Sequence, residues 1–110
     1  MDKEKFNERI CRIIWHDALQ NSIKPFLWSI DFRSIKVIDN GTEFMFQNHK
    51  KTGKVIIQYS ERTGLFNVTI IHANDERNPV IIENVYIDML VSVIDENLSC
   101  HELVEHGVAV

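Results

Sequence analysis

The segment 101–106, His-Glu-Leu-Val-Glu-His, is the stretch of the chain that comes closest to a recognisable chemical site. A zinc-protease helix carries two histidines four residues apart with a glutamate between them, so that both imidazoles share one face. Here His101 and His106 are five residues apart, and the residue four after His101 is Glu105. One histidine and one carboxylate do not make a zinc site. The sequence therefore predicts a solvated helix end and no metal site.

Cys11, His16 and Asp17 are the residue types of a nucleophile, a base and an orienting carboxylate. A histidine five residues after a cysteine on a helix points well away from the thiol. We therefore expect Cys11 to pack as a small apolar residue, and His16 and Asp17 to lie at the surface. No residue is assigned a catalytic role.

Lys50, Lys51 and Lys54 surround Gly53 and form a basic cluster, a candidate contact for an anion. A phosphate loop has a longer glycine-rich pattern between a strand and a helix, whereas this cluster lies between two expected strands. With a net charge of −4 and a pI near 5.7, the chain also lacks the basic excess of nucleic-acid-binding proteins. We expect a solvated turn whose lysines guard the sheet edge. Nucleic-acid contact through the loop from Lys50 to Lys54 is a third and weaker alternative, and it predicts binding that falls steeply as salt is raised.

A pocket between helices and sheet is the basis of an alternative function, that of a small-ligand-binding or enzymatic domain. Its lining would be Trp15, Trp28, Tyr59 and His72. Because a catalytic base needs an identifiable partner, a half-buried, hydrogen-bonded His72 is the simpler expectation. The sequence has no dinucleotide, nucleophile-elbow, calcium-loop or zinc-finger motif, so no cofactor is expected.

Length and composition predict a single globular domain over residues 1–110. Apolar residues make up 45% and charged residues 25%, which is typical of a globular chain. The N-terminus alternates acid and base where a secretory signal would be apolar, and no window approaches the roughly 18 consecutive apolar residues that span a bilayer. We therefore expect a cytoplasmic protein without a membrane partner, with Cys11 and Cys100 as free thiols.

Hydrophobic periodicity predicts an α+β fold with a helix, a four-stranded antiparallel meander and a second helix, with both helices on one face of the sheet. Lys24-Pro25 is expected to end the first helix, and residues 26–32 are ambiguous. Asn40-Gly41 suits a type I′ turn between the first two strands. From about residue 99 the periodicity is lost, and we expect a frayed tail. The expected elements are helices at 3–21 and from about 82 to 98, and strands at 34–39, 42–48, 54–60 and 65–72.

The period-two pattern gives the sheet an inner and an outer face. The outer face mixes polar side chains with Ile38, Met45, Ile56 and Ile71, so it is not wholly polar. The inner face is expected to carry ten large apolar side chains: Ile35, Val37, Phe44, Phe46, Val55, Ile57, Tyr59, Phe66, Val68 and Ile70.

The second helix is apolar over more of its circumference than packing on one sheet requires. Either the first helix packs beside it, or this extra stripe is a protein interface, most simply of a homodimer through this helix or through the outer sheet face. We therefore predict a non-enzymatic accessory or regulatory interaction module, with a protein partner or a second copy of itself. The candidate interface residues are Ile87, Val91, Ile94, Leu98, Met45 and Ile56.

Overall fold

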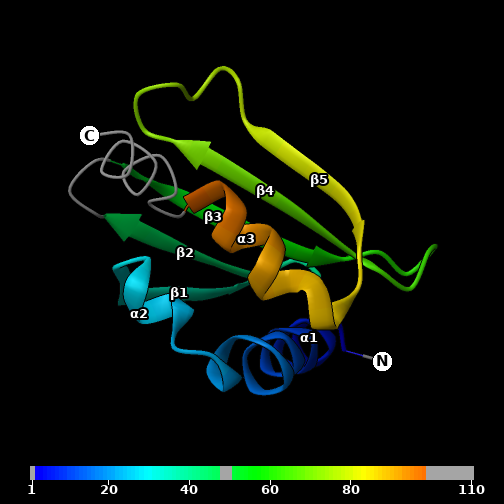
Figure 1. Cartoon of the computed structure of the whole chain (residues 1–110). Coiled ribbons are helices and arrows are strands. Elements are labelled where there is room, and N and C mark those ends of the chain that lie inside the picture. The colour runs from blue at the N-terminus through cyan, green and yellow to red at the C-terminus, as the bar shows by residue number, and fades with distance from the viewer. Residues whose placement is uncertain (1, 48–50, 99–110) are drawn as a thin grey trace, which may run out of the picture.

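A computed structural model describes residues 2–47 and 51–98 as two layers, an antiparallel sheet and the helices on one of its faces (Figure 1). The strands lie in the sheet in the order of the chain, and each pair of neighbours is antiparallel. The expected α+β meander is therefore confirmed. The strands are β1 (Ile30–Ile38), β2 (Gly41–Gln47), β3 (Thr52–Tyr59), β4 (Phe66–His72) and β5 (Val80–Val85). The helices are α1 (Lys3–Asp17), η1 (Leu19–Asn21), α2 (Lys24–Leu27), η2 (Ile87–Met89) and α3 (Leu90–Leu98).

The sheet has five strands rather than the four expected from the sequence. The additional strand, β5, occupies the segment where the second helix was expected to begin. Ile82 and Val85 are three residues apart, a helical spacing, yet both pack against the core from a strand. Asn84, with a φ of 60°, adds one residue between their pairings with β4. This bulge lets a strand reproduce the spacing of a helix.

The hairpin between β1 and β2 is present, but its turn lies one residue earlier than expected. The turn residues are Asp39 and Asn40, and Asn40 has a φ of 59°. Gly41 is already the first residue of β2, where a Cβ would lie 1.8 Å from the carbonyl oxygen of Ile57. Glycine is therefore required by the close approach of β3 and not by a positive φ.

The first helix ends at Asp17 and not at the expected Lys24-Pro25 boundary. Its start is capped by Asp2, whose side chain accepts a hydrogen bond from the N–H of Glu4 at 3.0 Å. Pro25 lies in the first turn of α2, where the missing N–H costs no helical hydrogen bond. The proline therefore begins a new helical turn instead of ending an old one.

The core lies between the inner face of the sheet and the helices, with α3 crossing in front of the sheet in Figure 1. Trp15 of α1 packs edge-on against Phe44, with ring centroids 5.4 Å apart, and donates its indole N–H to Thr42 Oγ1 at 3.1 Å. The hydroxyl of Thr42 donates in turn to the carbonyl oxygen of Lys36 at 2.9 Å. A buried polar side chain thus fixes α1 to the first two strands.

The prediction of the inner face is confirmed for most of its ten side chains. Ile35 and Tyr59 are half-buried, and Val37 lies exposed near the edge of the sheet. The side chains that are fully buried are Phe44, Phe46, Val55, Ile57, Phe66, Val68 and Ile70.

Candidate interaction surfaces

The short helix α2 is fixed to α3 by one carboxylate. The indole N–H of Trp28 donates to Asp95 Oδ1 at 2.9 Å, and the ammonium of Lys24 lies 3.2 Å from Asp95 Oδ2. Trp28 and Pro25 are buried. The chain then reverses into β1 through Ser29, which has a φ of 59°. Both ends of this helical turn are therefore held against the body of the fold.

The opposite side of α2 is apolar and exposed. Ile23, Phe26 and Leu27 follow the spacing i, i+3, i+4, which places them on one face of a helical turn. The ring of Phe32, in β1, lies 5.1 Å from the ring of Phe26. We call these four residues the α2 patch; their exposed fractions are 70% for Ile23, 72% for Phe26, 58% for Leu27 and 45% for Phe32.

Phe32 reaches Phe26 because β1 contains a bulge of several residues. Asp31 pairs with Met45 and Lys36 pairs with Glu43, so residues 32–35 stand opposite a single residue of β2. Ser34 stabilises the bulge, since its hydroxyl donates to the carbonyl of Asp31 at 2.6 Å and accepts from the N–H of Met45 at 2.8 Å. The bulge also interrupts this edge strand as a template for further pairing.

The outer face of the sheet is not covered by any helix or strand of the described residues. Met45 and Ile81 are exposed there, at 47% and 61%, and Ile56 and Ile71 are half-buried. Lys54 lies 3.6 Å from Glu43 on the same face. Two of the interface candidates from the sequence, Met45 and Ile56, thus belong to an open, partly apolar surface.

The other interface candidates lie on or next to α3 and face inward. Ile94 and Leu98 are buried in the core, and Ile87 and Val91 are half-buried against it. Most of the extra apolar stripe therefore packs within this chain, in the hydrophobic core.

The four residues of the alternative pocket do not converge. Trp15 and Trp28 are buried, and each donates its indole N–H within the fold. Tyr59 is the last residue of β3, whereas His72 pairs with Gly53 near the beginning of β3. The two side chains therefore lie at opposite ends of the sheet and share no site.

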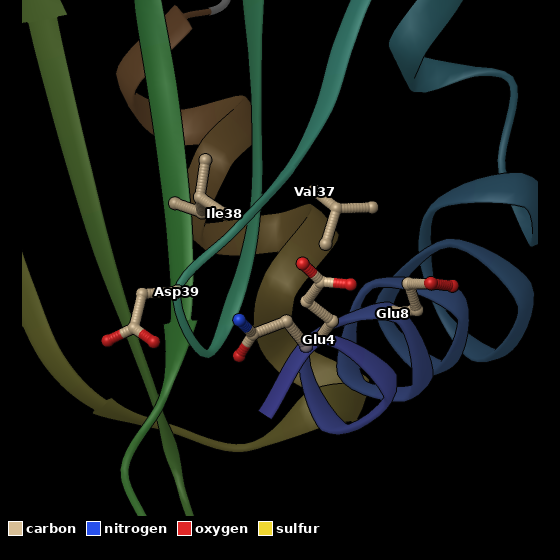
Figure 2. A pocket seen from close by; sticks show the side chains of 6 residues that line it. Glu4, Glu8, Val37, Ile38 and Asp39 are labelled. Carbon is tan, nitrogen blue, oxygen red and sulfur yellow. The ribbon is translucent and has the colours of Figure 1, made fainter. Parts of the chain in front are cut away.

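A shallow hollow of about 400 Å³ lies elsewhere, between the start of α1 and the end of β1. Figure 2 shows the side chains of Glu4 and Glu8 on the helix, near Val37, with Asp39 at the far side. The carboxylates of this hollow do not form a metal site. In residues 2–47 and 51–98, no three His, Cys, Asp or Glu side chains lie close enough together to hold a metal ion. The hollow is an acidic depression of the surface.

The lysine cluster is divided by the fold. Lys54 lies on the outer face beside Glu43, Lys51 is half-buried just before β3, and Lys50 lies outside the described residues. Gly53 belongs to β3 and not to the expected turn, and a Cβ there would lie 2.1 Å from the carbonyl oxygen of Ile71. This glycine therefore serves close strand packing.

Cys11 is a buried free thiol, and His16 lies at the surface with Nδ1 2.9 Å from Asp17 Oδ1. The thiol is therefore separated from the histidine, as expected. The segment 101–106 and Cys100 lie outside the described residues. None of the helices in the part of the chain that the structure describes is long and apolar enough to span a membrane.

Comparison with known proteins found no family model, no curated protein and no solved structure that matches this chain. Its function is therefore inferred from the geometry of these surfaces.

Proposed function

We propose that this chain is a non-enzymatic accessory or regulatory module that binds another protein through the α2 patch. The observation that carries the proposal is the division of one helical turn into two sides. Lys24, Pro25 and Trp28 hold the turn against the fold, while Ile23 and Phe26 project from it into solvent.

The energetics of binding favour such a patch. Large exposed apolar side chains that cluster on a surface mark interaction sites, and aromatic residues are frequent at the centre of interfaces. Asp95 fixes the backbone of α2 through Lys24 and Trp28. Binding a partner would therefore cost little conformational entropy in this segment. The patch thus combines apolar area with a preorganised support.

The proposed place of action is the cytoplasm, in keeping with the buried free thiol of Cys11. A module of this kind acts by occupying a surface of its partner, so its activity is measured as binding and not as turnover.

Site-specific photo-crosslinking tests the proposal. A photoreactive phenylalanine analogue is placed at Phe26, and the matched control carries it at Arg62, an exposed position in the turn between β3 and β4. We expect one protein to be crosslinked from position 26 and not from position 62, and to bind the unmodified chain after purification. Equal crosslinking from the two positions would contradict the proposal.

The same position provides a stability control. Phe26→Asp should change the free energy of unfolding by less than about 0.5 kcal/mol, because the side chain is largely exposed. Urea denaturation measures this change. A large loss of stability would show that Phe26 is needed by the fold, and would remove it as a contact residue.

A further inference from the structure

The outer sheet face, which is distinct from the α2 patch, has an ordered pattern of charged and apolar side chains. Cross-strand pairing aligns one row over all five strands: Lys36, Glu43, Ile56, Thr69 and Ile81. A second row, two residues away along the strands, consists of Asp31, Met45, Lys54 and Ile71. Four of these nine side chains are apolar, whereas the solvated face of an antiparallel sheet is typically polar.

The charges in the two rows cancel. Lys36 and Lys54 are balanced by Glu43 and Asp31, whereas the whole chain carries a net charge of −4. The negative excess of the protein therefore lies outside these rows. Two copies of this face can approach each other without the repulsion that the rest of the surface would produce.

We infer that the outer sheet face binds a second copy of this chain, face to face, in a twofold-symmetric dimer. A twofold interface requires a patch that is complementary to itself. A twofold axis that runs across the strands, between the two rows, brings Lys36 opposite the partner's Asp31 and Glu43 next to the partner's Lys54. The same axis places Ile56 diagonally next to the partner's Met45 and Ile71, which belong to the other row on the two neighbouring strands.

Association through the sheet edges is less favourable than association through the face. β1 is interrupted at residues 32–35, and β5 is interrupted at Asn84, where the N–H donates to Asn67 Oδ1 at 3.2 Å. Bulges of this kind turn an edge away from a regular ladder. Packing of two sheets leaves both edges as they are.

The size of the face agrees with a modest dimer. Five strands about 4.8 Å apart and about seven residues long, at about 3.4 Å per residue, give a flat area of about 600 Å². Stable interfaces bury about 800 Å² of accessible surface per partner, and side-chain relief raises the accessible area above the flat value. We expect a dimer that dissociates on dilution.

Sedimentation over a wide range of concentration measures this association, and charge reversal identifies the surface. Glu43→Lys and Lys54→Glu each place like charges together in a symmetric dimer, so each variant alone should associate at least about tenfold more weakly. An equimolar mixture of the two variants restores opposite charges at both contacts and should recover the dimer. Such a recovery requires that the partner be another copy of this chain.

The matched control is Glu61→Lys, which makes the same change of charge at an exposed position in the turn between β3 and β4. It should associate as the unmodified chain does. Circular dichroism and thermal melting show that the variants are folded, which matters because both charge reversals also break the ion pair between Glu43 and Lys54.

A chain that is monomeric at every concentration would overturn the inference, and so would a dimer that both charge reversals leave intact. Folded single variants that do not recover association on mixing would also overturn it. None of these outcomes bears on the α2 patch, because Phe26 and its neighbours are unchanged in every variant.

Discussion

The indole N–H of Trp28 donates a hydrogen bond to the carboxylate of Asp95, 67 residues further along the chain, at 2.9 Å. The same carboxylate also holds Lys24. This relationship joins the segment before the sheet to the helix after it. It holds the single helical turn α2 in place, and with it the exposed side chains of Ile23 and Phe26.

Replacement of Asp95 should detach α2 from α3. Asp95→Ala leaves the buried indole N–H of Trp28 without its acceptor and should lower the free energy of unfolding by about 1–3 kcal/mol. Asp95→Asn retains an acceptor oxygen for the indole and loses the charge that holds Lys24, so it should cost less. Urea denaturation followed by tryptophan fluorescence compares the two. An Asp95→Ala variant as stable as the unmodified chain would show that the contact does not anchor α2.

A second buried hydrogen bond can be tested by an almost isosteric change. Thr42→Val removes the acceptor of the Trp15 indole N–H and the donor to the Lys36 carbonyl. We expect a loss of about 1–3 kcal/mol in the free energy of unfolding. Thr69→Val, on the half-exposed outer face, is the matched control and should change stability by less than about 0.5 kcal/mol.

The double variant Trp15→Phe with Thr42→Val refines this prediction. Once the indole N–H is removed, the valine no longer leaves it unsatisfied, so the two changes should cost less together than the sum of their separate costs. Strict additivity in denaturation experiments would indicate that the two side chains do not interact.

Gly41 should be among the positions least tolerant of substitution. In Gly41→Ala the new Cβ would lie 1.8 Å from the carbonyl oxygen of Ile57, so the ladder between β2 and β3 must open. We expect a chain that is unfolded, or less stable by more than about 3 kcal/mol, which is in the range of severe core changes. Circular dichroism and thermal melting check this.

The control for Gly41 is Gly64, which lies in an exposed turn with a φ of 73°. Gly64→Asn should remain folded, because asparagine tolerates the left-handed region and nothing near the position is crowded. If Gly41→Ala were as stable as Gly64→Asn, the close approach of β3 would not be the reason for the glycine.

The sequence predicts the layered fold because β2, β3 and β4 alternate regularly between buried and more exposed side chains. It does not reveal β5, since Asn84 inserts a residue that gives Ile82 and Val85 a helical spacing. The sequence pattern does not reveal the bulge in β1 either. The bulge depends on two hydrogen bonds of the Ser34 hydroxyl, which donates to the carbonyl of Asp31 and accepts from the N–H of Met45, and these contacts exist only once the strands pair.

The α2 patch was missed for a different reason. The sequence predicts that Lys24-Pro25 ends the first helix and assigns no element to residues 26–32. The signal is nevertheless present in the sequence. Lys24 and Trp28 are four residues apart and face the core side, while Phe26 and Leu27 fall on the opposite side of the same turn. Once Lys24 and Trp28 are placed on the core side of a helical turn, helix geometry places Phe26 on the solvent side.

The most direct test of the central proposal uses the partner that crosslinking identifies, purified without the crosslink. The quantity measured is its affinity for this chain. Titration of that partner with the unmodified chain, with Phe26→Asp and with Arg62→Asp isolates the α2 patch from the rest of the surface. We predict that Phe26→Asp weakens binding by at least about tenfold, a typical effect for a central aromatic contact, while Arg62→Asp leaves it unchanged. Equal dissociation constants for all three chains would contradict the proposal.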